Sequence, residues 1–367
     1  ALQSVVPVGY GDVKTIGDLC DKVAEEVGNA FPDDPATEAD IRLTIGKIYL
    51  ALDDREPAEI HLKKAHDMRR GLLGRTHEET VEALRQLNLI YYYFGPSAKF
   101  LAGAREEYAI ALELYGSRDE RTMDADYWVL SGLDRVGKTD EAERESRRFC
   151  NLVEEGFGSD SVELCEARLD LARRQLRADR VEEAVATASD AYRIMHGQEN
   201  VTASQRRSAL NTYATLLLVS GRVDETKELY GNKRPPVSES IESPFQTGLG
   251  EPEGAVMILV FFETWCPFCQ RHMPWMEQVH RQYRAQGVEV IGLTSVSRSS
   301  SDEKVGKFIL DNELTHPVFR ESGRLSNFFG DYGIPFTVIM HQGEVVMELE
   351  GASRIDHRVI EGLVGAN

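Results

Sequence analysis

Two cysteines separated by two residues, Cys266 and Cys269, are the side chains with the clearest chemical meaning in this sequence. The apolar run Ala255–Phe262 before them predicts a buried strand, and the stretch that begins at Pro267 predicts a helix. A cysteine at this junction lies at a helix N-terminus, where unpaired N–H groups and the positive end of the helix dipole stabilise a thiolate. The spacing therefore indicates thiol-disulfide exchange, in which one sulfur attacks and the other resolves the mixed disulfide.

The same spacing also occurs in zinc sites, where a Cys-X-X-Cys pair supplies half of the ligands. No second pair and no nearby cluster of cysteine and histidine occurs in the sequence. We therefore expect no metal, and no cofactor other than a redox-active disulfide between Cys266 and Cys269.

Two cysteines in the first half of the chain, Cys150 and Cys165, fall on consecutive predicted helices. They stand eight residues before and seven residues after Gly158, so an antiparallel arrangement brings them to the same level. In an oxidising compartment such a pair forms a structural disulfide. The alternative is two buried thiols that pack as small apolar side chains, and both stay open.

The chain after residue 254 alternates strands and helices. The expected elements are strand Ala255–Phe262, helix Pro267–Ala285, strand Val288–Thr294, helix Asp302–Asn312, extended piece Pro317–Phe319, strands Thr337–His341 and Glu344–Glu350, and helix Arg354–Val364. Gln342 and Gly343 mark a tight hairpin between the last two strands. This order predicts a mixed sheet with helices on both faces.

A second signal, Gly333–Thr337, lies just before the predicted hairpin and contains an Ile-Pro pair. Together with the Trp-Cys-X-X-Cys segment and Pro274 in the following helix, it resembles the thioredoxin fold. The pattern is most similar to the TlpA/ResA type of bacterial thiol-disulfide oxidoreductases. The expected fold of this region is therefore α/β and thioredoxin-like.

The resemblance implies a role for each matching residue. Cys266 is the attacking thiolate and Cys269 is the resolving thiol. Pro335 is cis and lies beside the active disulfide, and the backbone of Ile334 pairs with an extended substrate peptide. The other residues expected to contact substrate at the rim are Trp265, Pro267 and Phe268.

The sequence departs from these families at the acidic position near the resolving cysteine. Thioredoxins have a buried acid six residues before the attacking cysteine, where this chain has Val260. TlpA/ResA-type proteins often have Glu three residues after the second cysteine, where this chain has His272. That spacing is close to one helical turn, so we expect His272 to approach Cys269 and accept its proton; the alternative is a partly exposed helical histidine. Glu263 is a second candidate acid.

The direction of exchange is also inferred from the resemblance. Ile334 before the cis-proline resembles the reducing members, so a reductase of protein disulfides is favoured, with an oxidase or isomerase as alternatives. The alternative to an enzyme is a protein-binding scaffold in which the thioredoxin-like domain serves recognition. Domains of this type are usually extracytoplasmic, in the bacterial periplasm, soluble or membrane-tethered, and draw electrons from a membrane-embedded thiol transporter.

The first 230 residues contain an internal repeat. Turn-forming residues recur every 42 positions at Gly95, Gly137, Asp179 and Gly221. Small residues follow such turns at Ala58, Ala142, Ala184 and Thr226. The pattern of each unit predicts two amphipathic helices that stack on the next pair. The pattern resembles tetratricopeptide repeats of the kinesin-light-chain type, with about five helix pairs and an extra helix near Val13–Val27.

One repeat departs from this pattern, since Phe100 stands where Ala is expected and Pro96 follows the turn. We expect that unit to be distorted. Repeats of this family usually bind a peptide or a protein partner in their concave groove. A spacer role or self-association into a homo-oligomer is the alternative.

The expected architecture is multidomain, with an all-α repeat superhelix over residues 1–230, a linker that also supplies an edge strand over 231–254, and a thioredoxin-like domain over 255–367. The net charge of −19 repels phosphate backbones and argues against nucleic acid as a partner. No stretch approaches the roughly 20 consecutive apolar residues that a membrane-spanning helix needs.

Overall fold

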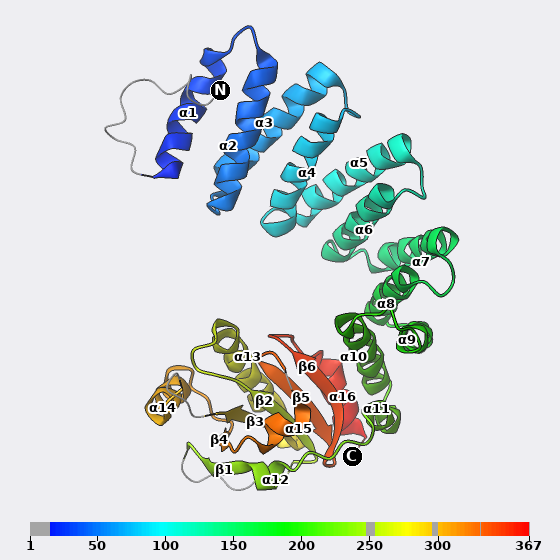
Figure 1. Ribbon diagram of the computed structural model, residues 1–367, viewed down its shortest axis with the longest axis vertical. Helices are drawn as coiled ribbons and strands as arrows, with labels where there is room; N and C mark the ends of the chain where they lie inside the picture. Colours follow the sequence, from blue (N-terminus) through cyan, green and yellow to red (C-terminus); the bar gives the residue numbers. More distant parts are fainter. Residues whose placement is uncertain (1–14, 247–253, 296–299, 331, 367) are drawn as a thin grey trace. The chain divides into compact units, whose positions relative to one another are not determined.

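The computed structural model describes residues 15–246, 254–295, 300–330 and 332–366 (Figure 1). The chain divides into two compact units, Ala1–Ser159 and Asp160–Asn367. None of the helices in the described ranges has both the length and the apolarity that a membrane crossing requires.

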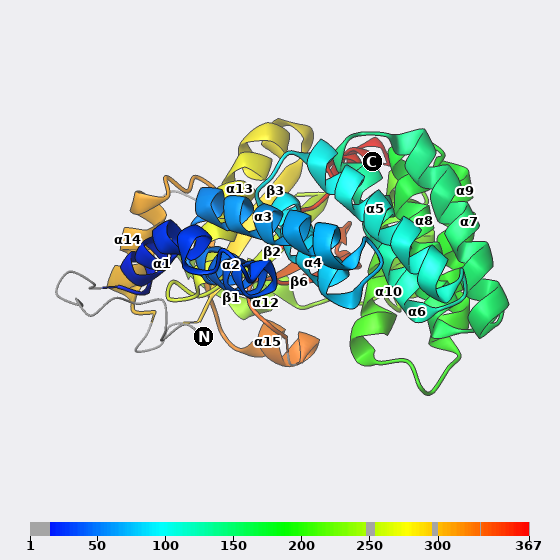
Figure 2. The same ribbon diagram turned by 90° about the horizontal axis from the view of Figure 1, so that it is seen from above.

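The first unit consists of helices that pack in consecutive antiparallel pairs (Figures 1 and 2). They are α1 (Ile16–Ala30), α2 (Pro35–Ala51), α3 (Arg55–Leu73), α4 (Glu78–Tyr93), α5 (Ser97–Tyr115), α6 (Glu120–Arg135) and α7 (Thr139–Phe157). Helix α1 is the extra helix expected before the first pair, although Val13 lies outside the described residues. A capping box at Thr15 and Asp18 begins it.

The turns inside the helix pairs confirm the 42-residue repeat. Four of them contain a residue with a left-handed backbone conformation, Asp53 (φ 60°), Gly137 (72°), Asp179 (59°) and Gly221 (76°). The expected turn at Gly95 differs, since its φ lies outside this region. The small residues at the start of the second helices, Ala58, Ala142, Ala184 and Thr226, are completely buried because the two helices of a pair approach closely there.

The second unit begins with the last helices of the repeat region and continues into a six-stranded sheet. The helices are α8 (Val162–Arg177), α9 (Val181–His196), α10 (Ala203–Val219) and α11 (Val223–Leu229). The strands are β1 (Ile241–Pro244), β2 (Val256–Phe261), β3 (Val288–Thr294), β4 (Val318–Glu321), β5 (Phe336–His341) and β6 (Glu344–Glu350). The fold therefore combines tetratricopeptide-like helix pairs with a thioredoxin-like domain.

The strand order is β1-β4-β3-β2-β5-β6, with β2 at the centre of the thioredoxin-like core. Strand β2 runs parallel to β3, and β3 runs parallel to β4, while β5 is antiparallel to β2 and to β6. Because Phe261 pairs with Phe336, the end of β2 meets the start of β5. This register brings the Cys-X-X-Cys segment and the Ile-Pro segment to the same edge of the sheet.

Helices cover both faces of this sheet. Helix α13 (Pro267–Tyr283) connects β2 to β3, and α14 (Asp302–Asp311) connects β3 to β4. Helix α16 (His357–Gly365) ends the domain. The short helices α12 (Val237–Ser240) and α15 (Arg324–Phe329) were not expected from the sequence. Figure 2 shows α13 and α15 on opposite sides of the strands.

The last helix pair packs directly on the sheet domain. Leu218 of α10 and Tyr230 after α11 belong to the same apolar core as Val256 and Val345 of the sheet. Helix α10 contacts both α16 and β6. The final pair of a repeat array has no following pair to cover its apolar face, and here the sheet domain covers it. The expected domain boundary at residue 230 falls inside this unit.

The segment 231–254 was expected to be a linker with an edge strand. Within it, β1 pairs antiparallel with β4 at the edge of the sheet. The amide of Phe245 donates to the carbonyl of Val318 at 2.9 Å, which extends the pairing beyond β1.

Candidate active site

Cys266 is the N-cap residue of α13, so its sulfur lies where the first amides of the helix have no helical partner. Its Sγ accepts a hydrogen bond from the backbone N–H of Cys269 at 3.4 Å. It also lies 3.8 Å from the carbonyl oxygen of Ile334, to which the thiol donates. Cys266 is 4% exposed and Cys269 is fully buried, so of the two residues only the first has any exposed surface.

Hydrogen bonds within the loop between β2 and α13 position Cys266. Its backbone N–H donates to the carbonyl of Glu263 at 3.1 Å. The backbone N–H of Thr264 donates to the hydroxyl of Ser300 at 3.1 Å, and Gln270 Nε2 donates to the carbonyl of Thr264 at 2.9 Å. Hydrogen bonds therefore connect this loop both to α13, which follows it, and to the segment before α14.

The Ile334–Pro335 peptide bond is cis and faces the sulfur of Cys266. The backbone N–H of Gly351 donates to the carbonyl of Pro335 at 2.8 Å. On the strand side, the ring of Phe336 stacks on Tyr332 at 4.4 Å. These contacts hold the carbonyl of Ile334 at the edge of the site.

Two exposed aromatic side chains flank the nearly buried sulfur. Trp265 and Phe268 are each 56% exposed, and Pro267 between them is also exposed. Arg271 lies over the ring of Phe268 at 5.1 Å. Exposed aromatic residues around a reactive group provide a contact surface for a partner chain.

The second thiol is held in its protonated form. Burial raises the pKa of Cys269 to about 12, and the hydrogen bond to Cys266 and the negative charge of Glu263 act in the same direction. A hydrogen bond from the main chain of Glu263 opposes this rise. Resolution of a mixed disulfide at Cys266 therefore requires removal of a proton from Cys269.

His272 is buried, so the alternative expectation of a partly exposed helical histidine is wrong. Its Nε2 lies 3.3 Å from the hydroxyl of Thr337 on β5, so its hydrogen-bond partner is Thr337 rather than Cys269. Burial lowers the pKa of His272 to about 4, so the ring is neutral at pH 7. Its expected role as proton acceptor stays a prediction.

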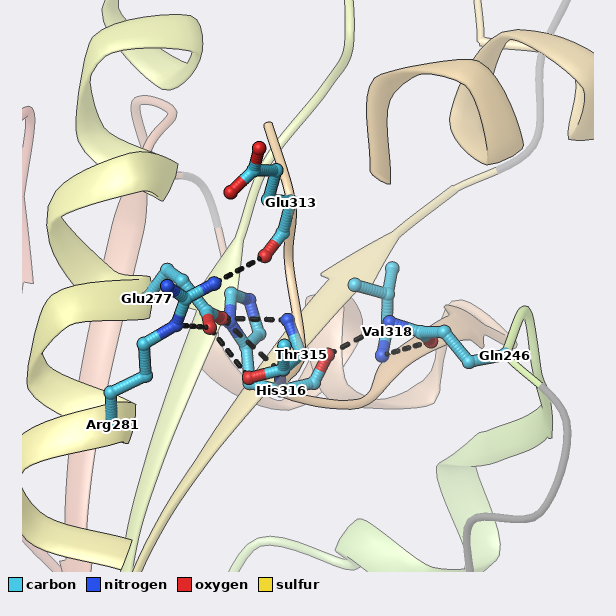
Figure 3. Close-up of polar contacts among 7 residues, drawn as sticks. All are labelled: Gln246, Glu277, Arg281, Glu313, Thr315, His316 and Val318. Atoms are coloured by element: carbon cyan, nitrogen blue, oxygen red, sulfur yellow. Dashed lines mark hydrogen bonds and ion pairs between the residues drawn. The ribbon is translucent and has the colours of Figure 1, made fainter. Parts of the chain in front are cut away.

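A buried carboxylate in the middle of α13 anchors the helix that carries both cysteines (Figure 3). Glu277 accepts from Arg281 Nε at 2.6 Å on its own helix. It also accepts from the N–H of Thr315 at 2.8 Å and from His316 Nδ1 at 2.7 Å, in the segment before β4. Gln246 continues the network, since its Nε2 donates to the carbonyl of His316 at 2.8 Å. No sequence motif marks this cluster.

Cys150 and Cys165 are both buried, and the structure describes them as thiols. They belong to different units, Ala1–Ser159 and Asp160–Asn367. The disulfide between them is therefore not observed, and for the oxidised protein it stays a prediction.

A second candidate site lies in the first unit, between α4, α5 and α6. It is a cavity of about 350 Å³ whose wall includes Tyr92, Phe100 and Trp128. These three rings meet edge to face, with centroids 5.0 to 6.0 Å apart. Phe100, the residue that departs from the repeat pattern, thus forms part of this wall, while α5 remains an unbroken helix.

Polar groups line the same cavity. Glu107 is buried and accepts from Arg85 Nε at 2.7 Å and from Asn88 Nδ2 at 3.1 Å. The oxygen of that amide, Asn88 Oδ1, is buried with no hydrogen-bond partner among the described residues. The repeat pattern predicted the helices but not these residues. The replacement at Phe100, together with Pro96 after the turn, marked this repeat as unusual.

Residues 245–350 match the AhpC/TSA family. Fold and site together make this region a thioredoxin-like domain that is similar to thiol-disulfide oxidoreductases.

Curated relatives match the same part of the chain. Thiol-disulfide oxidoreductase ResA of Halalkalibacterium halodurans is 36% identical over 112 residues, 29% of this chain and 57% of the relative. ResA of Oceanobacillus iheyensis is 30% identical over 122 residues, 33% of this chain and 62% of the relative. This chain thus spans about six tenths of the length of these two relatives.

Solved structures resemble the two regions separately. A Podosopora anserina structure described as kinesin light chain TPR-like repeats covers 54% of this chain and 93% of its own, with 15% identity and a TM-score of 0.46. StoA from Bacillus subtilis covers 29% of this chain and 82% of its own, with 23% identity and a TM-score of 0.27.

Proposed function

We propose that this protein reduces disulfide bonds in other proteins, with Cys266 as the attacking group and Cys269 as the resolving group. The observation that supports this most directly is the position of Cys266 Sγ. It accepts the N–H of Cys269 at 3.4 Å at the start of α13 and lies 3.8 Å from the carbonyl of Ile334. An extended peptide that pairs with the backbone of Ile334 presents its own disulfide to this sulfur.

The reaction proceeds in two exchanges. The Cys266 thiolate attacks one sulfur of the substrate disulfide and forms a mixed disulfide, and the other substrate sulfur leaves as a thiolate that takes up a proton. Cys269 then loses its proton and attacks Cys266, which releases the second substrate thiol. Two electrons pass to the substrate, and the protein is left with a disulfide between Cys266 and Cys269. This disulfide is the only redox group that the mechanism needs.

Regeneration requires a dithiol donor, and we propose a membrane-embedded thiol protein in an extracytoplasmic compartment. The ResA relatives carry the name thiol-disulfide oxidoreductase, which supports this class of reaction for the thioredoxin-like domain. The direction of electron flow is our inference.

Insulin reduction tests the reaction. The wild-type chain with dithiothreitol is expected to precipitate the insulin B chain faster than dithiothreitol alone, and Cys266→Ala is expected to give only the background rate. Cys269→Ala is expected to hold substrates as mixed disulfides at Cys266 that mass spectrometry identifies. Equal rates for the wild type and Cys266→Ala would contradict the enzymatic role and favour a binding scaffold.

We further propose that the repeat helices bind a peptide segment of a partner protein in the cavity between α4, α5 and α6. The aromatic wall of Tyr92, Phe100 and Trp128 suits an apolar side chain.

A peptide array probed with the full-length chain tests this second proposal. Peptides that bind are expected to lose about ten-fold or more in affinity to Trp128→Ala, because buried aromatic anchors dominate such contacts. Tyr93→Ala is the matched control, since Tyr93 is an exposed aromatic residue that does not line the cavity. Binding that is insensitive to Trp128→Ala would contradict the proposal.

A further inference from the structure

The last repeat helices and the sheet domain enclose a cavity of about 290 Å³. The residues that line it lie within the unit Asp160–Asn367. One wall comes from α9, α10 and the end of α11, and the other comes from α15, the segment before β5, and strands β5 and β6. Its volume is close to the lower limit of about 300 Å³ for ligand pockets, which is enough for one large side chain. Because each region supplies only one wall, neither the repeats nor the sheet domain forms this cavity alone.

Aromatic rings line the wall on the sheet side. The ring of Phe336 stacks on Tyr332 with the centroids 4.4 Å apart, and it meets Phe329 edge to face at 5.6 Å. Phe336 is buried, whereas Tyr332 and Phe329 are half-buried and retain exposed surface. A wall of partly exposed rings suits a large apolar side chain.

The opposite wall comes from the repeat helices. Leu210 of α10 and Leu229 of α11 both line the cavity and are half-buried. The hydroxyl of Tyr230 donates to Asn211 Oδ1 at 3.0 Å and accepts from the N–H of Glu348 at 3.4 Å. These hydrogen bonds join α10 to β6, so the two walls are connected at this point.

The cavity lies beside the segment that faces the attacking sulfur. Phe336 directly follows Pro335, and Glu350 of β6 pairs with Phe336. The next residue, Gly351, donates its N–H to the carbonyl of Pro335 at 2.8 Å. Successive residues of an extended chain advance by about 3.3 Å. A substrate that pairs with the backbone of Ile334 can therefore place a residue about two or three positions from its cysteine in this cavity.

Positive charge lies in the wall of the same cavity. Arg206 and Arg207 of α10 both line it. Arg207 forms an ion pair with Glu350. Arg206 is half-buried and donates to two uncharged partners, the backbone carbonyls of His196 and Gln198 at the end of α9. An acidic group on the substrate would give this guanidinium a charged partner.

We propose that this cavity is a substrate subsite that the repeat helices and the sheet domain form together. It binds a large apolar side chain about two or three residues from the substrate cysteine, and Arg206 pairs with an acidic group next to that side chain. The inference rests on the proposed reductase reaction and adds to it the class of substrate segment. The repeat region thus takes a direct part in the choice of substrate.

Fluorogenic peptides test this subsite. In each peptide a disulfide joins a labelled segment to a quencher, and the reduced full-length chain is mixed with it without added dithiol. The panel has Gly, Leu, Phe or Trp two or three positions from the cysteine on either side, followed by Asp or Asn. At one of these positions the second-order rate constant of the wild type is expected to be about ten-fold higher for Phe-Asp than for Gly-Asn.

Variants of the repeat wall make the result specific. Leu210→Trp narrows the cavity and is expected to reduce the preference for Phe over Gly to less than about two-fold. Leu210→Ala widens it and is expected to shift the preference from Phe towards Trp. Arg206→Gln can still donate to the two carbonyls and is expected to remove only the preference for Asp over Asn. Arg193→Ala is the matched control, because Arg193 is exposed on α9 outside the cavity, and it is expected to keep both preferences.

The outcomes distinguish this inference from the reaction on which it rests. If no peptide is reduced in a manner that depends on Cys266, the proposed reaction fails. If the wild type reduces all peptides equally fast, or if both Leu210 variants keep its preference for Phe, only the subsite is overturned. If Arg206→Gln keeps the preference for Asp, the pairing with an acidic group is wrong. A wild-type dimer that Leu210→Trp converts into a monomer in analytical ultracentrifugation would overturn the subsite and assign the cavity to a second copy of this chain.

Discussion

At the scale of single residues, the environment separates two chemically identical thiols. Cys266 receives a backbone N–H at the start of a helix and faces the carbonyl of Ile334. Cys269, one helical turn further, is enclosed by apolar side chains, and its pKa is raised by burial. The environment of His272 also differs from the alternative expectation of a partly exposed side chain, because the ring is buried against Thr337 and Trp275.

Burial of His272 predicts a stability that depends on pH. The pKa of His272 is lowered to about 4 in the folded protein, from an ordinary value of 6.5. Between these values the unfolded chain binds a proton that the folded chain does not, so the free energy of unfolding falls as the pH decreases from 6.5 towards 4. Because of this residue, the free energy of unfolding is expected to be about 2 kcal/mol lower at pH 5 than at pH 7.5. Urea unfolding followed by tryptophan fluorescence at both pH values measures the total change, to which His61 and His280 also contribute because burial lowers the pKa of each to about 4.

His272→Gln is expected to lose that part of the pH dependence, whatever it does to stability at pH 7.5. His357→Gln serves as control, because His357 is exposed on α16, and it is expected to keep the wild-type dependence. Identical slopes in the wild type and His272→Gln would contradict a buried neutral imidazole.

At the scale of elements, α13 must be held in place because it carries both sulfurs. Its N-terminus is fixed by the loop after β2, and its middle is fixed by Glu277, which accepts hydrogen bonds from the segment before β4 (Figure 3). A carboxylate with several donors bridges two segments that are far apart in sequence. The cluster therefore stabilises the geometry of the site without taking part in its chemistry.

Glu277→Gln is expected to lower the free energy of unfolding by about 3 kcal/mol, because an amide cannot accept all of these hydrogen bonds. Burial alone raises the pKa of Glu277, but hydrogen bonds from His316, Thr315 and Arg281 outweigh it and hold the pKa well below its ordinary value. The stabilisation is therefore complete above the ordinary pKa of glutamate and is lost as the pH falls through the lower folded value. Urea unfolding of wild type and variant across acidic pH measures both effects.

Arg281→Ala is the comparison within the same cluster. The Arg281 side chain is 52% exposed, so its loss is expected to cost less than about 1 kcal/mol. If Glu277→Gln were no more destabilising than Arg281→Ala, the bonds to Thr315 and His316 would not have the importance that we assign to them.

At the scale of the whole molecule, the last helix pair of the repeat region and the sheet domain share a core. Helix α10 approaches α16 so closely that a Cβ on Gly362 would lie 2.1 Å from the carbonyl oxygen of Leu218. Glycine is thus required at this point of contact. The last helix pair and the thioredoxin-like domain belong to one compact unit.

Gly362→Ala is therefore expected to force α10 and α16 apart and to destabilise the protein by about 2 kcal/mol. Thermal unfolding monitored by circular dichroism measures the change as a lower melting temperature. Gly365→Ala is the matched control on the same helix, since no atom lies within 4 Å of its added Cβ, and it is expected to be neutral or slightly stabilising. Equal melting temperatures for the two variants would rule out the close contact.

The sequence alone determined the elements and the position of the cysteine pair at the start of a helix, because both depend on local patterns. Periodicity and turn residues placed β2, α13, β3, β5 and β6 to within about two residues, and the repeat predicted the helix pairs. Helix α15 was missed because six residues are too few to show a helical period.

Tertiary structure decided the features that depend on contacts between distant segments. The direction of the His272 ring, the hydrogen bonds of the Glu263 and Glu277 carboxylates and the aromatic cavity at Phe100 each depend on partners from elsewhere in the fold. The same holds for the cover that the sheet domain provides over the last repeat. A sequence pattern specifies which face of a helix is apolar, but only the packed chain specifies what that face meets.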